Sequence, residues 1–315
     1  MSTELSVVIP VFNEAANLQI LNKRIVAVLT QMQLTFEILY VNDGSTDSSL
    51  STIKQLSADD KRVRFIHFSR NFGHQVAVSA GLENAIGNKI VIIDADLQDP
   101  PEFIAQLYEK ICEGYEVVCA RRKNRKGESW LKKRTAHWFY RILKKITTVD
   151  IPLDTGDFRI IDRKIAEILR TMPESHKFLR GQIAWIGFRQ TALEYEREER
   201  LHGSSGYTYK KMLRFALDGI TAFSDFPLKV VTWFGFLVSS IAFVVILFAF
   251  YSRFILKDYV QGWTSLMISV LFIGGIQMIA IGIIGEYMSR MNTDIRQRPL
   301  YIVEESNIEE NLDKH

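Results

Sequence analysis

Two long segments of the chain carry no charged residue: Val230–Ser252 and Gly262–Gly285. At a rise of about 1.5 Å per residue, a helix over either segment is about 35 Å long and can cross a hydrocarbon layer of about 30 Å. A buried helical hairpin of a soluble domain is disfavoured, because core helices seldom run so far without a charge. We therefore expect two transmembrane helices, at about residues 230–252 and 263–285, within a membrane region of residues 229–288.

The basic residues around these segments predict the orientation of the protein. The connector between the segments holds only Arg253 and Lys257, whereas more basic residues flank the outer ends: Lys210, Lys211, Arg214, Lys229, Arg290, Arg296 and Arg298. Because basic loops stay in the cytoplasm, both termini and a C-terminal tail of residues 289–315 are expected there. We predict a multi-pass protein of the inner (plasma) membrane, with no signal peptide ahead of its polar first residues.

Residues 207–228 are expected to form an amphipathic helix directly before the first apolar segment. Over Tyr207–Phe223, charged residues fall on one side and apolar residues on the other. This pattern suits a helix in the headgroup layer, although an ordinary surface helix shows the same pattern. The position next to a membrane span favours the interface, and Thr135–Ile146 is a second candidate.

Residues 1–206 alternate between hydrophobic strands and helices. We expect a helix that Asn13 caps, helices at Asp47–Leu56 and His74–Ile86, and strands at Leu5–Val11, Phe36–Val41, Val63–Phe68 and Ile90–Ile93. Such alternation predicts an α/β domain whose mostly parallel sheet is covered by helices on both faces. Ligands of such sheets bind beyond the carboxyl ends of the strands.

Polar clusters follow three of these strands: Pro10-Val-Phe-Asn-Glu14, Asn42-Asp-Gly-Ser45 and Asp94-Ala-Asp96. Residues two apart in an extended segment point the same way, so Asp94, Asp96 and Gln98 would offer oxygen ligands to a divalent cation. An isolated Asp-x-Asp is more simply an acidic loop that caps the next helix. The convergence of three clusters on one edge favours a binding site.

Several other kinds of site lack support. The chain has neither a Gly-x-Gly-x-x-Gly nor a Gly-x-x-x-x-Gly-Lys-Ser/Thr motif, and its six histidines show no zinc spacing. His74 and His202 are expected to be polar surface residues, and Cys112 and Cys119 reduced thiols. A nucleotide would instead be held by Asp43 on the base or ribose and by a metal on the diphosphate. The net charge of +3 is unremarkable, and we expect no nucleic-acid partner.

At these residues the chain resembles the GT-A family 2 glycosyltransferases. Within that family it is similar to the polyprenyl-phosphate glycosyltransferases related to dolichol-phosphate mannose synthase and to bacterial undecaprenyl-phosphate glucosyltransferases. The resemblance covers nearly the whole chain, including both apolar segments, and is carried by these motifs: Val8-Ile-Pro-Val-Phe-Asn-Glu14, Val41-Asn-Asp-Gly-Ser45, Ser69-Arg-Asn-Phe-Gly73, Asp94-Ala-Asp-Leu-Gln-Asp-Pro-Pro101, Asp154-Thr-Gly-Asp-Phe-Arg159 and Arg200-Leu-His-Gly-Ser-Ser-Gly-Tyr207. It implies a GT-A (Rossmann-like) catalytic domain over residues 1–206.

The resemblance also implies roles for individual residues. Asp157 matches the residue usually given the role of base, and Asp94, Asp96 and Gln98 would handle the diphosphate with Mg²⁺ or Mn²⁺. Nucleotide contacts would come from Pro10, Val11, Asn13, Glu14, Asp43, Ser45 and Asp94. Contacts to phosphate and acceptor would come from Arg121, Arg125, Lys132, Arg134, Arg200 and Ser205. The family often has Lys where this chain has Gly206, so either Lys210 or Lys211 replaces that positive charge or nothing does.

The implied reaction is the inverting transfer of a sugar from a nucleotide donor to polyprenyl (undecaprenyl) phosphate at the cytoplasmic membrane face. UDP-glucose is the preferred donor, and GDP-mannose, UDP-N-acetylglucosamine and UDP-aminoarabinose stay open. A processive polysaccharide synthase usually has a Gln-x-x-Arg-Trp motif, of which Gln182-Ile-Ala-Trp185 is only a distant echo. A noncatalytic membrane scaffold that binds nucleotide sugars is disfavoured by the complete set of Asp94, Asp96 and Asp157. Small residues in the apolar segments permit a homo-oligomer.

Overall fold

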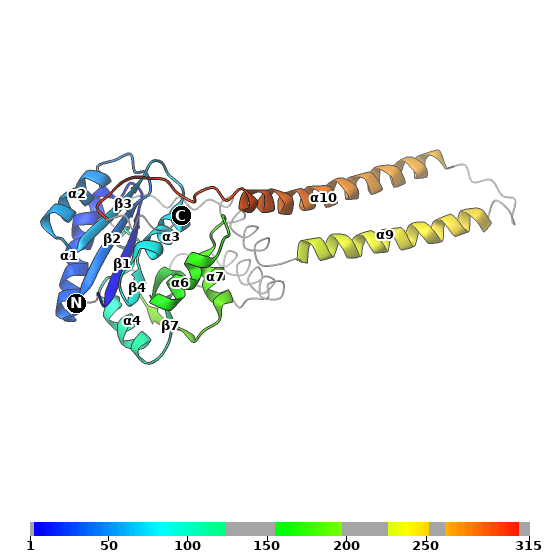
Figure 1. The fold of residues 1–315 in the computed structure, drawn as a ribbon. Coiled ribbons are helices and arrows are strands. Elements are labelled where there is room, and N and C mark those ends of the chain that lie inside the picture. The colour runs from blue at the N-terminus through cyan, green and yellow to red at the C-terminus, as the bar shows by residue number, and fades with distance from the viewer. Residues whose placement is uncertain (1–2, 124–154, 197–225, 252–261, 309–315) are drawn as a thin grey trace. The chain divides into compact units, whose positions relative to one another are not determined.

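A computed structural model describes residues 3–123, 155–196, 226–251 and 262–308 (Figure 1). The chain divides into two compact units: a sheet domain that includes the residues from Gln297 onward, and a unit that contains the two long helices. Both candidate interfacial helices lie outside the described residues, apart from the last three positions of 207–228. The same holds for five of the predicted phosphate and acceptor contacts: Arg125, Lys132, Arg134, Arg200 and Ser205.

The sheet domain is built on one sheet, which runs in the order β7-β5-β6-β4-β1-β2-β3-β8 within the described residues. Its strands are β1 (Leu5–Val11), β2 (Phe36–Asn42), β3 (Val63–Phe68), β4 (Lys89–Ile92), β5 (Val117–Arg122), β6 (Thr155–Asp162), β7 (Gln190–Tyr195) and β8 (Val303–Ser306). The central strands β4, β1, β2 and β3 are parallel, as are β5 and β7, whereas β6 and β8 run antiparallel to their neighbours. The expected α/β domain with a mostly parallel sheet is therefore confirmed.

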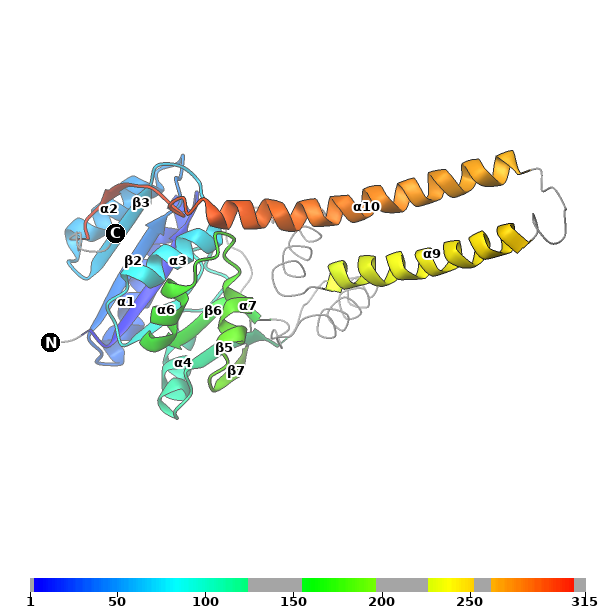
Figure 2. The same cartoon turned by 45° about the vertical axis from the view of Figure 1, so that its right-hand side comes forward.

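Helices cover both faces of the sheet (Figure 2). One core cluster lies under α1 (Ala15–Gln31), α2 (Ser49–Asp59) and α4 (Phe103–Cys112). The other lies under α3 (His74–Asn84), α6 (Arg163–Thr171) and α7 (Leu179–Ile186). Because successive side chains of a strand point to opposite faces, Val7 and Ile9 enter the first cluster and Val8 enters the second.

The strands predicted at Leu5–Val11 and Val63–Phe68 are confirmed to the residue. Two local expectations are wrong. Asn13 does not cap α1. Its side-chain oxygen accepts hydrogen bonds from the backbone N–H and the hydroxyl of Thr46, and Glu14 occupies the cap position. The strand before Asp94 ends at Ile92, and Asp96 lies in a turn whose next residue, Leu97, has a φ of 59°. The turn, and not the two-residue repeat of a strand, therefore orients Asp96.

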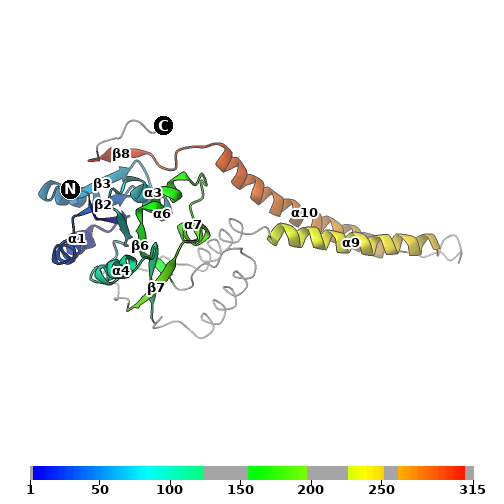
Figure 3. The same ribbon diagram turned by 60° about the horizontal axis from the view of Figure 1, so that its bottom comes forward.

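The last strand was not expected. Residues 289–315 were expected to form a tail, but Val303–Ser306 form β8, which pairs antiparallel with β3 at the edge of the sheet (Figure 3). The segment therefore completes the sheet of the first domain.

The second unit contains α9 (Phe226–Tyr251) and α10 (Trp263–Ile295), which contact each other. Large apolar side chains on both helices face outward; the exposed fractions of Trp233 and Met278 are 76% and 69%. Among the described residues, one segment is apolar and long enough to cross a membrane, Phe272–Ile295 of α10, and Leu228–Val238 of α9 is a shorter apolar stretch.

Candidate active site

The ends of β1 and β2 are joined by hydrogen bonds between the loops that follow them. Pro10 and Val11 are the last, buried residues of β1, and Val11 pairs in register with Asn42. The Asn13 backbone N–H donates to Ser45 Oγ at 3.0 Å, and Asn13 Oδ1 accepts from the Thr46 N–H at 2.8 Å. The positive φ of Asn13, 57°, turns its amide toward that loop. Two of the predicted polar clusters therefore form one connected edge.

Asp43 joins this edge to the start of α3. Its carboxylate accepts from the backbone N–H of Phe72 at 2.7 Å and of Gly73 at 3.0 Å. These groups precede the first turn of α3, where N–H groups lack partners within the helix. Burial raises the pKa of Asp43, and the two backbone N–H groups offset part of that rise.

Gly44 is required where the loop of residues 69–73 crosses the end of β2. Its φ is +64°, and a Cβ at this position would lie 2.3 Å from the carbonyl carbon of Arg70. Any side chain would therefore push the loop away from the edge of the sheet.

Asp94 and Asp96 lie in the turn after β4. Asp96 is 7% exposed, and its Oδ1 accepts from the Gln98 backbone N–H at 3.1 Å. Asp94 Oδ1 is buried without a hydrogen-bond partner in the described part of the chain. Burial raises the pKa of Asp94 to about 6, the nearby His74 opposes the rise, and the carboxylates of Asp157, Asp99 and Asp96 add to it. The turn thus concentrates negative charge.

His74 connects this turn to Asp157 on β6. Its Nε2 lies 3.2 Å from Asp157 Oδ2 and 3.7 Å from Asp94 Oδ1. Burial alone would lower the pKa of His74, but the two carboxylates outweigh it and raise the pKa to about 9. His74 is therefore a cation at neutral pH, and its Nε2–H donates a hydrogen bond to Asp157 Oδ2.

Asp157 also pairs with Arg180 on α7. Arg180 Nε donates to Oδ1 at 3.0 Å and Nη2 to Oδ2 at 3.1 Å, while Arg159 Nη2 lies 3.5 Å from Oδ1. Burial by itself would raise the pKa of Asp157, but Arg180 and His74, with Arg159 behind them, hold it well below its usual range. A carboxylate so paired is a poor proton acceptor.

The structure thus brings together Asp43, Asp94, Asp96 and Asp157 around the start of α3. His74 is exposed, as expected of a surface residue, with 42% of its side chain accessible; sequence reasoning missed its contacts to Asp94 and Asp157, and it missed Arg180. Arg121 lies at the end of β5, in register with Thr155 of β6; its side chain is half-exposed, and its Nη2 is 2.6 Å from Glu194 Oε1.

The turn after β4 fits a divalent cation in its chemistry. Asp94 and Asp96 supply hard oxygen ligands, and Asp94 Oδ1, which has no hydrogen bond and only the His74 imidazole at 3.7 Å, can accept a further positive partner. Within the described residues, no group of three or more His, Cys, Asp or Glu side chains is placed to hold a metal by itself. A cation here would therefore take further ligands from Gln98 or from bound phosphate.

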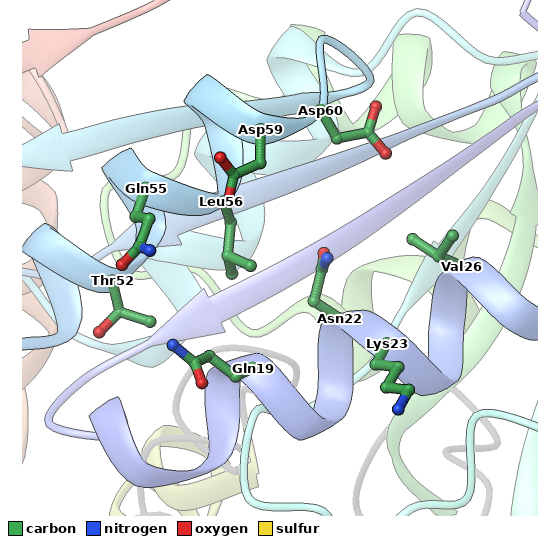
Figure 4. A pocket seen from close by; sticks show the side chains of 9 residues that line it. All are labelled: Gln19, Asn22, Lys23, Val26, Thr52, Gln55, Leu56, Asp59 and Asp60. Carbon is green, nitrogen blue, oxygen red and sulfur yellow. The ribbon is translucent and has the colours of Figure 1, made fainter.

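A separate depression lies between α1 and α2 (Figure 4). Its lining mixes amides, charged groups and apolar side chains: Gln19, Asn22, Lys23, Val26, Thr52, Gln55, Leu56, Asp59 and Asp60. None of the predicted site residues is among them, and the depression has no part in the site described above.

The amino-acid sequence of the chain matches those of known glycosyltransferases. Residues 6–169 match the family described as Glycosyl transferase family 2. An uncharacterised glycosyltransferase of Bacillus subtilis (strain 168) is 46% identical over 303 residues, which cover 96% of this chain and 94% of the relative. A prophage bactoprenol glucosyl transferase homolog of Escherichia coli (strain K12) is 40% identical over 300 residues, 95% of this chain and 98% of the relative.

Among solved structures, a mannosyltransferase of Pyrobaculum calidifontis in complex with GDP-Man and Mn²⁺ is 18% identical, with a TM-score of 0.47. The match covers 68% of this chain and 61% of the mannosyltransferase.

Proposed function

The chain belongs to glycosyl transferase family 2, and from this premise we propose that it transfers glucose from UDP-glucose to a polyprenyl phosphate. It is a glycosyltransferase; the sugar, the nucleotide and the lipid acceptor are the proposal. The relatives named as bactoprenol glucosyl transferases, which align over nearly their whole length, support the glucosyl group and the acceptor.

The observation that carries the proposal is that His74 lies between two carboxylates at one end of the sheet. Its Nε2 is 3.7 Å from Asp94 Oδ1 and 3.2 Å from Asp157 Oδ2. Two carboxylates of opposite character meet there. Asp94 lacks a hydrogen bond at Oδ1 and has a raised pKa, whereas Asp157 is fully paired and has a lowered pKa. Titratable neighbours whose pKa values are driven apart are typical of sites with divided roles.

We assign the leaving diphosphate to the turn after β4. Asp94, Asp96 and Gln98 would hold Mg²⁺ or Mn²⁺, which when bound neutralises negative charge on the diphosphate as it leaves. The nucleotide would lie along the joined ends of β1 and β2, against Pro10, Val11, Asn13, Glu14, Asp43 and Ser45. Asp43 already bonds two backbone N–H groups, so its further contact to the base or ribose would use the remaining lone pairs of its carboxylate.

Asp157 is assigned an electrostatic and orienting role. The acceptor phosphate has a second pKa near 6, by analogy with phosphorylated side chains, and is mostly dianionic at neutral pH. It needs no strong base, and Asp157 with its low pKa would not act as one. A phosphate oxygen would attack the anomeric carbon as the bond to the diphosphate breaks, so UDP leaves with the electron pair and the configuration inverts. The charge of Asp157 would stabilise the positive character that develops on the sugar.

We further propose that α9 and α10 both span the inner membrane, with both termini in the cytoplasm and residues 207–228 at the interface. The outward-facing apolar side chains of both helices support this assignment, since in water they would leave a large apolar surface exposed. Anchoring serves the chemistry, because a polyprenyl chain keeps its phosphate at headgroup height. Arg121, Arg125, Lys132, Arg134, Arg200 and Ser205 remain the proposed contacts to phosphate and acceptor, within a catalytic domain of residues 1–206 whose sheet β8 completes.

A donor screen tests the proposal. Purified protein is incubated with undecaprenyl phosphate, Mg²⁺ and, separately, UDP-glucose, GDP-mannose, UDP-N-acetylglucosamine and UDP-aminoarabinose, and the extracted lipid is analysed by mass spectrometry. We expect the hexosyl product from UDP-glucose. A product from another donor alone would overturn the assigned sugar, and a polymer would favour a processive synthase.

A further inference from the structure

The segment that follows α10 is fixed to the sheet domain by hydrogen bonds of the backbone and of side chains. β8 pairs with β3, with Ser306 opposite Ile66 and Val303 opposite Phe68 (Figure 3). Asn307 Oδ1 accepts from the Phe65 N–H at 2.7 Å, and Asn307 Nδ2 donates to Ser57 Oγ at 2.7 Å. A β3 edge without this strand would expose a row of unpaired backbone groups.

Tyr301 connects this segment to the end of β3. Its ring stacks on Phe68 with a centroid distance of 4.8 Å and an interplanar angle of 23°. Its hydroxyl donates to Glu83 Oε2 on α3 at 2.9 Å. The next residue, Ile302, accepts a hydrogen bond at its carbonyl from the Ser69 N–H at 3.1 Å. Tyr301 and Ile302 therefore hold both β3 and the first residue of the loop that follows it.

That loop leads directly to the nucleotide edge. Phe68 contacts Phe72 edge-on at a centroid distance of 5.7 Å, and the N–H groups of Phe72 and Gly73 bind the Asp43 carboxylate. The backbone of Arg70 and Asn71 crosses Gly44 too closely to admit a Cβ. A shift of the loop would therefore move Asp43 or remove two of its hydrogen bonds.

We propose that residues 301–307 position the donor-nucleotide edge, with Tyr301 as the principal positioning residue. Tyr301 fixes Phe68, Phe68 and Ser69 fix the loop of residues 69–73, and this loop fixes Asp43. The membrane anchor is thus followed by a segment that completes the donor site. The inference rests on the proposed function in that it takes Asp43 as a nucleotide contact.

The test compares Tyr301→Ala with Tyr301→Phe in the full-length protein in nanodiscs. Tyr301→Phe keeps the stacked ring and loses only the hydrogen bonds of the hydroxyl, to Glu83 and Asn84, whereas Tyr301→Ala loses the ring and these bonds. Lys54→Ala is the matched control, because it breaks the 2.5 Å ion pair to Glu305 on β8, which does not touch the loop. Two quantities are measured: hydrogen exchange of the Phe72 and Gly73 amides, and the Kd of UDP with Mn²⁺ by calorimetry.

For Tyr301→Ala we expect exchange of these amides to speed up about tenfold and the Kd of UDP to rise about tenfold, which corresponds to about 1.4 kcal/mol. The donor KM should rise with little change in kcat. Tyr301→Phe and Lys54→Ala should stay within about twofold of wild type in both measurements. A segment with a merely structural role would lower the Tm of Tyr301→Ala and leave the Kd, measured well below that Tm, unchanged.

Unchanged exchange at Phe72 and Gly73 in folded Tyr301→Ala would overturn the inference, as would faster exchange with an unaltered Kd of UDP. If the wild-type protein binds no UDP, the proposed donor is wrong. The exchange measurement then still decides whether Tyr301 fixes the loop.

Discussion

Arg180 donates from Nε and Nη2 to the two carboxylate oxygens of Asp157, at 3.0 and 3.1 Å. The pair is bidentate, and the Asp157 side chain is only 12% exposed. In such a position an arginine fixes the orientation of a carboxylate and keeps it ionised. The pair therefore argues that Asp157 contributes a fixed negative charge to the reaction.

Asp157→Asn should lower kcat about a hundred- to a thousandfold, as the loss of one preorganised electrostatic group does. The pH profile distinguishes charge from base. In the wild type, kcat should rise with pH through about 6 as the acceptor phosphate loses its second proton. Because the lowered pKa keeps Asp157 ionised throughout that range, the variant should retain this limb at its lower rate. A limb that disappears in Asp157→Asn would identify Asp157 as the base.

Arg180→Lys and Arg180→Gln probe the other half of the pair. Lysine keeps the charge but cannot donate through a planar fork, so we expect kcat to fall about tenfold. Glutamine leaves Asp157 with one charged partner fewer and should cost about 1–3 kcal/mol of unfolding free energy besides a larger loss of kcat. Steady-state kinetics and chemical denaturation measure the two effects. Equal activity of both variants and wild type would remove Arg180 from the site.

Asp96→Asn should weaken Mn²⁺ binding in the presence of UDP at least tenfold, because a neutral amide replaces one of the charged oxygen ligands. Electron paramagnetic resonance of free Mn²⁺ measures the affinity directly. The matched control is Asp60→Asn, which changes a partly buried carboxylate that pairs with Arg62 at the end of α2, outside the candidate site. Unaltered Mn²⁺ binding in Asp96→Asn would place the metal elsewhere.

Gly44→Ala should destabilise the protein by more than about 1 kcal/mol, since it combines a positive φ with a Cβ 2.3 Å from the Arg70 backbone. Gly187→Ala separates the two causes. Gly187 has a φ of +92° but nothing within 4 Å of its Cβ position, so only the backbone strain applies there. The shift in Tm should be clearly larger for Gly44→Ala. Equal Tm shifts in the two variants would mean that the loop of residues 69–73 moves aside for the new Cβ without destabilising the protein.

The sequence predicts the sheet well where its strands are buried on both faces. Leu5–Val11 and Val63–Phe68 are short segments rich in β-branched and aromatic residues, so a local pattern is enough to find them. β8 is different: Val-Glu-Glu-Ser is short, acidic and exposed, and it becomes a strand only because β3 offers it an edge. No local signal marks such a strand.

The residues of the site likewise divide into those that a local sequence pattern marks and those that only the folded structure brings together. Asp43, Asp94 and Asp96 were found because they closely follow hydrophobic strands, and Asp157 was found through the family resemblance. His74 and Arg180 escaped because they meet Asp157 across 83 and 23 residues of sequence, from the first turns of two helices. Their charges, and with them the low pKa of Asp157, depend on packing that periodicity cannot predict.

The central claim is that a carboxylate turn at the end of β4 serves sugar transfer to a membrane-held phosphate. It is tested most directly by incubating radiolabelled UDP-glucose, undecaprenyl phosphate and Mg²⁺ with the wild-type protein and with Asp96→Asn, and then extracting with chloroform. The account predicts labelled lipid of inverted anomeric configuration from the wild type, and about a hundredfold less or none from Asp96→Asn at equal amounts of folded protein. Labelled lipid formed equally well by both proteins would contradict it.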